Sequence, residues 1–226
     1  MKTVFPSKKF WNQFANRFEI YKSMVPLFKR SKNLIVETKL YGQNDRKILK
    51  RSDEMEEFVI RETNTLVRDY NTRNKCFDGL IYIMLKKDSS KRIIPLYIGK
   101  AETVWKNGNL SENLKNLASR KDKFARWGDN YQYHIGDLSA ATCGHAEDKI
   151  QKKYKDWSNT IFEHSPVNQP KLRKDIFFWA KAWDRNDIGI WEEFGPTRLT
   201  FLEYLLIGVA SNTFEKELLN EERVNR

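Results

Sequence analysis

The chain has 226 residues, a length that suits one large domain, and its content of 40% hydrophobic and 13% aromatic residues excludes a disordered basic tail. Its 41 Lys and Arg residues exceed its 30 Asp and Glu residues and give a formal net charge of +11. The best apolar run, residues 201–210, contains Glu203 and is too short to span a membrane. These features predict a folded, basic, soluble protein.

The positive charge is concentrated at one end of the chain. Residues 1–50 contain twelve basic and three acidic side chains, whereas residues 51–226 contain 29 and 27. A localised positive field attracts a polyanion, most commonly nucleic acid, and double-stranded DNA is the expected partner. The charge count alone gives the two alternatives, a membrane surface and simple solubility, together about the same weight as nucleic acid. Two cysteines without a CxxC spacing indicate a reduced, cytoplasmic chain.

The first third of the chain, residues 1–75, is predicted to be a basic helical region. Aromatic and aliphatic residues recur at spacings of three and four across residues 8–40, with an interruption at Pro26, and a second helical pattern covers residues 53–70. The helical spacing of apolar residues ends before Phe77, and a second region, residues 76–226, begins here. Apolar runs at residues 80–85 and 93–99 flank a polar connector and predict a β-hairpin.

Further elements follow the hairpin. Ser111 is a plausible N-cap for a helix that ends at Gly128, and residues 131–135 suggest a short strand. Residues 139–174 are less regular, with a possible helix over residues 146–157. Residues 175–183 predict a strand. A strong helix starts after Gly195, and its buried face is predicted to consist of five residues: Phe201, Leu202, Leu205, Leu206 and Val209.

Two tyrosines lie one on each arm of the predicted hairpin. Tyr82 ends the segment at residues 80–82 (Leu-Ile-Tyr), and Tyr97 opens residues 97–101 (Tyr-Ile-Gly-Lys-Ala). Either tyrosine alone is more typical of an amphipathic strand residue with an apolar ring and a wet hydroxyl. Glu203 is harder to explain in this way, because a carboxylate among apolar neighbours costs free energy if it is buried without a cation or donor.

In this order, the segments resemble the signature of the GIY-YIG nuclease family. Residues 97–101 match its second half without alteration, but Leu80 stands where the first half has glycine, and the nearest glycine is Gly79. The resemblance covers roughly residues 77–220, with a long interruption near 139–174 that is read as an insertion. It implies an α/β fold, a small mixed or antiparallel sheet flanked by helices, as the nuclease domain of residues 76–226.

The resemblance also implies a site in which two hairpin tyrosines, an arginine and a glutamate surround one divalent metal and a scissile phosphate. Glu203 matches the metal-binding glutamate. Arg126 is the first choice for the arginine and Arg120 the second. Asn220 matches the closing asparagine of the family, and Asn212 competes with it.

The residue types suit phosphodiester hydrolysis, which needs an activated water and neutralised phosphate charge. The resemblance implies that Tyr82 or Tyr97 activates the water. Tyr82 is preferred, with its pKa lowered from about 10 by nearby arginine and metal charges. His134 is the reserve base if the tyrosine only positions the water. Lys100 is expected to touch phosphate or to support the tyrosine.

The predicted function is therefore Mg²⁺-dependent (or Mn²⁺-dependent) cleavage of DNA, with a site-specific restriction or mobile-element endonuclease as the preferred setting. The alternative is a catalytically inactive DNA-binding protein with a degenerate nuclease fold, which the missing signature glycine favours. The sequence leaves the choice between monomer and homodimer open.

Overall fold

A computed structural model of the chain describes residues 7–105, 107–145 and 150–221. Its centre is a four-stranded antiparallel sheet with the strand order β1-β6-β4-β5. The strands are β1 (Val25–Pro26), β4 (Phe77–Lys87), β5 (Ile93–Glu102) and β6 (Ile176–Asp184). The predicted α/β class, the hairpin and the strand near residue 175 are confirmed.

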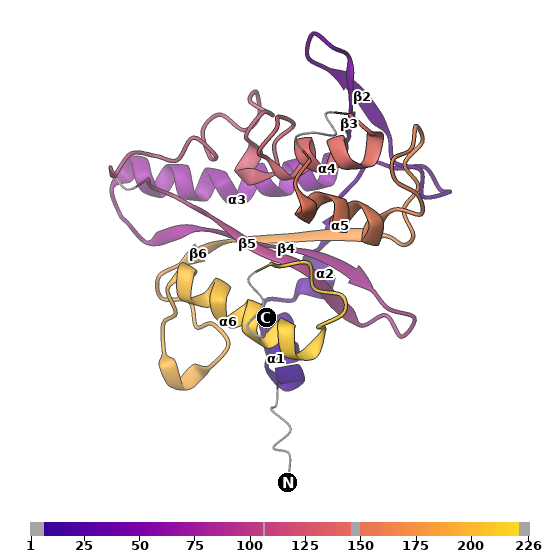
Figure 1. Ribbon diagram of the computed structural model, residues 1–226. Coiled ribbons are helices and arrows are strands. Elements are labelled where there is room, and N and C mark those ends of the chain that lie inside the picture. Colours follow the sequence, from indigo (N-terminus) through magenta and orange to yellow (C-terminus); the bar gives the residue numbers. More distant parts are fainter. Residues whose placement is uncertain (1–6, 106, 146–149, 222–226) are drawn as a thin grey trace.

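Helices cover both faces of this sheet (Figure 1). The upper layer in that view holds α3 (Asp53–Thr72), α4 (His134–Cys143) and α5 (Lys152–Ile161), and the lower layer holds α1 (Ser7–Arg17) and α6 (Leu199–Thr213). The short helix α2 (Ile20–Ser23) connects α1 to the sheet. No helix in the described residues is both long enough and apolar enough to cross a membrane.

Helix α3 shows how local sequence sets an element's limits. The hydroxyl of Ser52 accepts a hydrogen bond from the backbone N–H of Met55 at 2.9 Å and so caps the helix. The acidic residues Asp53, Glu54 and Glu56 in the first turn complement the helix dipole. The helix ends at Arg73, which adopts a left-handed conformation with φ of 60°. The helix predicted over residues 53–70 is confirmed.

The β4–β5 hairpin carries both tyrosines on one face. Tyr82 lies opposite Gly99, and Met84 lies opposite Tyr97. Because alternate residues of a strand share a face, Tyr82 and Met84 point to the same side, and Tyr97 joins them there. A register shift follows Met84, whose neighbour Leu85 pairs with Pro95. This β-bulge lies beside Tyr97.

The basic N-terminal region begins with helix, as predicted, but the helical expectation for residues 27–40 is wrong. Pro26 belongs to the edge strand β1 instead, opposite Phe177 of β6. A separate two-stranded sheet follows, built from β2 (Thr38–Tyr41) and β3 (Arg46–Leu49). The region packs into the same core as the rest of the chain, with Trp11 and Phe14 almost completely buried.

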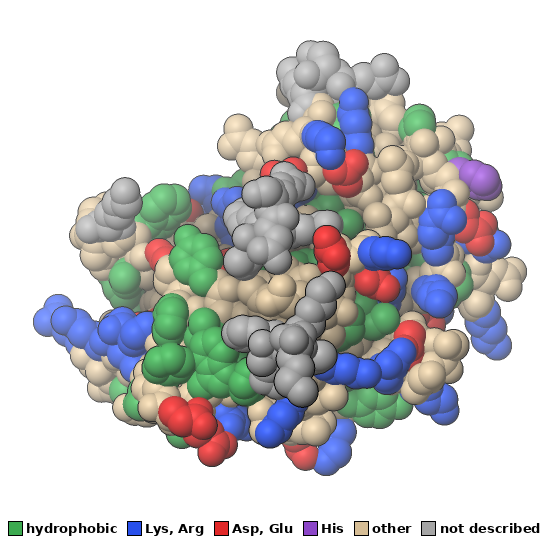
Figure 2. All heavy atoms as spheres, turned by 60° about the horizontal axis from the view of Figure 1, so that its bottom comes forward, with side chains coloured by type: hydrophobic (Ala, Val, Ile, Leu, Met, Phe, Trp, Pro, Cys, Tyr) green, Lys and Arg blue, Asp and Glu red, His purple; other side chains and the backbone are tan. Residues whose placement is uncertain are grey.

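Ion pairs engage about half of the positive charge of this region. Of the eleven basic residues in the described part, residues 7–50, six pair with carboxylates: Arg17, Lys22, Lys29, Arg30, Lys39 and Lys50. Figure 2 shows the face that carries α1 and α6, where Lys and Arg side chains are interleaved with Asp and Glu. The charge pole that the sequence suggests is therefore partly neutralised within the fold.

Three local expectations are wrong. Residues 111–127 form turns and one short 3₁₀ helix, η1 (Phe124–Arg126), because Asn116, Ala125 and Arg126 adopt left-handed conformations that an α-helix excludes. The strand expected over residues 131–135 is absent, since α4 begins within it. In α6, Phe201 is 49% exposed rather than buried. The other short 3₁₀ helix, η3 (Glu192–Phe194), precedes α6.

Candidate active site

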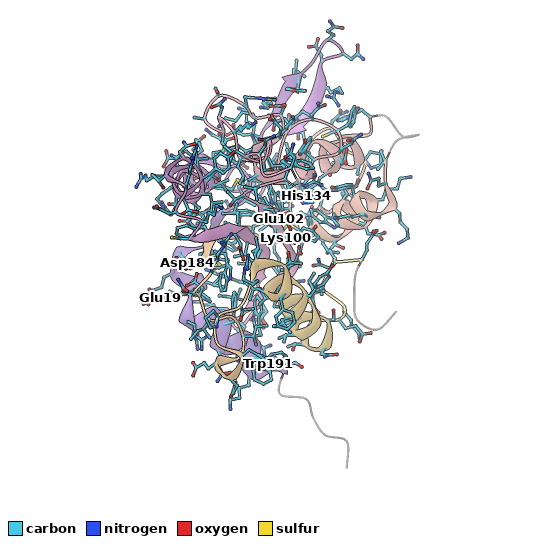
Figure 3. All side chains as sticks on the ribbon, turned by 90° about the vertical axis from the view of Figure 1, so that its left-hand side faces the viewer. Glu19, Lys100, Glu102, His134, Asp184 and Trp191 are labelled. Carbon is cyan, nitrogen blue, oxygen red and sulfur yellow. The ribbon has the colours of Figure 1, made fainter. Side chains whose placement is uncertain are left out.

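A cleft of about 740 Å³ gathers most of the residues that the sequence singles out. We call it the tyrosine cleft. It wraps around the edge strand β5, between the upper helices and α6, and Figure 3 shows His134, Glu102 and Lys100 one below another in this part of the molecule. Its lining includes Tyr82, Tyr97, Lys100, Glu102, Arg126, Gln132, His134, Asp137, Lys153, Tyr154 and Glu203.

Gly99 makes room for the ring of Tyr82. A Cβ atom at Gly99 would lie 2.7 Å from Cε2 and 2.8 Å from the hydroxyl oxygen of Tyr82. These separations are shorter than real Cβ contacts, so only glycine lets the ring lie across β5 in this position. The glycine of the segment at residues 97–101 thus has a steric role in placing the first tyrosine.

His134 joins two tyrosines at the start of α4. Its Nε2 lies 3.3 Å from the hydroxyl of Tyr82, and its Nδ1 lies 3.0 Å from the hydroxyl of Tyr154. The ring is stacked on Trp157 with 5.2 Å between ring centroids and is 3% exposed. The three side chains therefore form a buried hydrogen-bonded chain along the wall of the cleft.

Burial sets the protonation states of this chain. Burial, together with the neighbouring Tyr97, raises the pKa of Tyr82 well above its usual value and outweighs the opposite effect of Arg126. Arg126 alone therefore does not produce a phenolate; the sequence-based expectation of a lowered pKa also counts the charge of a bound metal and stays a prediction. Burial, then Lys153 and Arg126, hold the pKa of His134 well below its usual value, so the imidazole is neutral at pH 7.

Two cationic side chains face the tyrosines. Arg126 lines the cleft from η1, where it and Ala125 have φ values of 75° and 48°, and its guanidinium lies 5.5 Å from the ring centroid of Tyr133. Lys153 of α5 donates a hydrogen bond to the hydroxyl of Tyr97 at 3.2 Å. A phosphate in the cleft would meet both positive charges.

The carboxylates of the cleft provide hard oxygen donors. Glu203 of α6 is half-buried and lines the cleft. Asp137 of α4 is 8% exposed; its Oδ1 accepts the backbone N–H of Gln132 at 2.9 Å, and its buried Oδ2 has no hydrogen-bond partner among the described residues. Burial raises the pKa of Asp137 against that hydrogen bond. A cation beside Oδ2 would give this oxygen a partner and would lower the free-energy cost of burying the Asp137 charge.

This donor set fits Mg²⁺. Within the described ranges, no three His, Cys, Asp or Glu side chains stand together as a ready metal cage. Mg²⁺ keeps several of its waters and needs only one or two protein carboxylates. Glu203 or Asp137 could therefore hold it, and Glu102, which forms an ion pair with Lys100, also lines the cleft.

The lining of the cleft distinguishes between the sequence-based candidates for the site arginine and tests the candidate asparagine Asn220. Arg126 lines it, whereas Arg120 is engaged by Glu112 and Asp122. Asn220 is buried behind β5, where its side chain accepts the N–H of Ile98 at 2.9 Å and donates to the carbonyl of Ile98 at 2.8 Å. Asn220 thus braces the strand that carries Tyr97 and is not part of the cleft lining.

Sequence reasoning missed Asp137, Lys153 and Tyr154. They lie on α4 and α5, partly within residues 139–174, which were read as an insertion. The helix expected over residues 146–157 is found in part, as α5, while residues 146–149 lie outside the described residues. Tyr154, Trp157 and Ile161 recur at helical spacing and are all buried. Nothing in the sequence relates Lys153 to Tyr97, which is 56 residues away.

Comparison of the chain with protein-family models, with curated proteins and with solved structures finds no match.

Proposed function

We propose that the protein is a metal-dependent endonuclease that hydrolyses phosphodiester bonds in double-stranded DNA, with a site similar to that of GIY-YIG nucleases. The observation that carries this proposal is the composition of the tyrosine cleft. Both hairpin tyrosines, Arg126, His134 and Glu203 line one cavity, although they are up to 121 positions apart in sequence. An acid–base pair, a cation and a carboxylate are the groups that phosphodiester hydrolysis needs.

The proposed proton path runs through Tyr82 and His134. A water in the cleft gives a proton to the hydroxyl oxygen of Tyr82 while the phenolic proton of Tyr82 passes to Nε2 of His134. The neutral imidazole can accept this proton, and its Nδ1–H donates to Tyr154 throughout. The hydroxide oxygen bonds to phosphorus as the bond to the leaving oxygen breaks. The leaving oxygen takes a proton from solvent. His134 later releases its own proton to solvent, which restores the neutral imidazole.

Charge neutralisation comes from the other side chains. Arg126 and Lys153 would bind the non-bridging oxygens of the phosphate and keep it beside Tyr82. Glu203 or Asp137 would hold a divalent cation. When bound, the cation supplies Lewis-acid stabilisation of the charge that develops on the phosphate. Lys100, paired with Glu102 at the mouth of the cleft, would orient the approaching phosphate.

The proposed setting is the cytoplasm, where the free thiols of Cys76 and Cys143 would stay reduced. A restriction or mobile-element endonuclease remains the preferred role.

A plasmid-nicking assay tests the proposal. Supercoiled DNA is incubated with the protein and Mg²⁺ or EDTA, and wild type is compared with Glu203→Gln. We expect nicking only with Mg²⁺, and a rate at least about 100-fold lower for Glu203→Gln because a group that stabilises transition-state charge is lost. DNA affinity should stay near the wild-type value.

The matched control is Glu57→Gln, which removes the same charge from an exposed position on α3. It should nick like wild type. DNA binding without nicking at any concentration of Mg²⁺ or Mn²⁺ would contradict the proposal and favour an inactive DNA-binding protein with the same fold.

A further inference from the structure

A second cleft, of about 880 Å³, adjoins the tyrosine cleft. It lies at the end of the sheet where β4 begins and β6 ends, and Glu102 and Val104 line both clefts. We call it the arginine cleft, after the basic side chains of its wall. Its lining includes Arg73, Lys75, Asp78, Thr103, Arg185 and Arg198.

Asp78 holds two guanidinium groups at the wall of the arginine cleft. Arg198 donates to both of its oxygens, from Nη2 at 2.6 Å and from Nε at 2.7 Å, and Arg185 donates from Nε at 3.0 Å. The carboxylate is 10% exposed, whereas the side chains of Arg198 and Arg185 are 64% and 39% exposed. One largely buried carboxylate thus holds two guanidinium groups whose side chains stay partly exposed and have further N–H donors.

Arg73 and Lys75 add two further positive charges. Both are exposed, and within the described part of the chain neither forms an ion pair with a carboxylate. The nearby carboxylate of Asp69 accepts the backbone N–H groups of Cys76 and Phe77 at 2.9 and 3.2 Å. The Asp69 carboxylate is therefore engaged by backbone N–H groups that follow α3. Arg73 and Lys75 remain available to a ligand.

Thr103 supplies a separate indication of a ligand. It is 4% exposed, it lines the arginine cleft, and its hydroxyl has no hydrogen-bond partner among the described residues. A buried hydroxyl without a partner costs free energy, and a ligand oxygen that reached Thr103 from the cleft would supply the missing bond.

We propose that the arginine cleft binds the phosphate groups of the nucleic acid strand on one side of the scissile bond. This inference rests on the proposed function, because the strand that enters the tyrosine cleft would continue past Glu102 into the neighbouring cavity. Two guanidinium groups held by Asp78, two further exposed cations and an unpartnered hydroxyl suit a chain of phosphodiesters.

The test measures DNA affinity against salt concentration. A fluorescent 25-base-pair duplex and its single strand are titrated in EDTA, so that no cleavage occurs, with wild type and with the double variant Arg73→Asn/Lys75→Asn. Asparagine suits the left-handed conformations at these positions, where φ is 60° and 57°. We expect the slope of log affinity against log salt for the duplex to fall by about 1 to 2, since each phosphate contact contributes about 0.9.

Two further variants sharpen this result. Lys32→Asn/Lys174→Asn removes two exposed positive charges outside both clefts and should keep the wild-type slope. Thr103→Val removes the hydroxyl but no charge, so affinity should fall roughly fivefold, as expected for one lost hydrogen bond, with the slope unchanged.

The outcomes separate this inference from the proposed function. If wild type cleaves DNA and Arg73→Asn/Lys75→Asn keeps the wild-type slope, the arginine cleft is not a phosphate site and the nuclease proposal stands. If the slopes change as expected but no variant or wild type cleaves, the cleft assignment stands and the nuclease proposal fails. Absence of DNA binding by wild type would overturn both.

Discussion

His134 illustrates how surroundings decide the chemistry of a single residue. The sequence offers it only as a reserve base, because one histidine carries no spacing signal. In the structure, aromatic rings enclose it, and tyrosine hydroxyls contact both ring nitrogens. Such an imidazole accepts a proton from one side and donates from the other. The same enclosure raises the pKa of Tyr82. In the proposed mechanism the two residues therefore transfer the proton as a pair, and neither is an alternative base to the other.

The lowered pKa of His134 predicts a pH-dependent stability. The unfolded chain takes up protons at histidine near pH 6.5, whereas the folded chain keeps His134 neutral to a lower pH. Stability is therefore complete above about pH 6.5 and falls as the pH decreases below it, by at most about 1.4 kcal/mol per pH unit. Urea unfolding between pH 7.5 and 5.0 measures this decline.

We expect His134→Phe to weaken the decline and the exposed-site variant His164→Gln to leave it unchanged. Part of the decline should remain in His134→Phe, because burial also lowers the pKa of His145. An identical pH dependence in wild type and His134→Phe would contradict the neutral, buried imidazole.

At the scale of elements, the β4–β5 hairpin depends on the fit between Tyr82 and Gly99. Gly99→Ala would bring a methyl group within 3 Å of the ring. We expect a loss of about 1–3 kcal/mol in unfolding free energy, as for other overpacked sites. The same Gly99→Ala change in a Tyr82→Leu background should cost less, because the ring is gone. Equal losses in the two backgrounds, measured by chemical denaturation, would disprove the steric coupling.

The elements differ in how far the sequence predicts them. The hairpin, β6 and α6 follow from apolar runs and periodicity, because each buries its own apolar face. The segment of residues 103–133 does not, because buried polar residues such as Ser111 and Asn113 and the left-handed Arg126 follow no periodic pattern. The pairing of both tyrosines with Arg126 and Glu203 was predictable only from the family resemblance. The contributions of Lys153 and Asp137 depend on tertiary contacts.

At the scale of the whole molecule, a buried ion network ties the N-terminal region to the cleft. The guanidinium of Arg51 donates to Asp129 at 2.6 Å, to the carbonyl of Trp127 at 2.6 Å and to Glu56 at 2.9 Å. Arg51 and Asp129 have side chains that are 1% and 2% exposed. The loop that presents Arg126 is thus fastened to residues before the hairpin.

Arg51→Ala should destabilise the fold by about 1–3 kcal/mol, because the buried carbonyl of Trp127 loses its donor and Asp129 keeps only Lys39 as a cationic partner. Lys171→Ala breaks a solvent-exposed ion pair with Glu163 and should change the unfolding midpoint little. Urea denaturation of the two variants at pH 7 makes the comparison. Similar losses would show that the network contributes no more than a surface pair.

The placement of β1 has a consequence for attempts to isolate the C-terminal region. β1 pairs with Phe177 and Phe178 and so covers the outer edge of β6. A fragment that starts near residue 76 would expose that edge, with its aromatic side chains, as an open template for strand addition. Such a fragment would tend to self-associate into insoluble material, and its inactivity would say nothing about the chemistry of the intact chain.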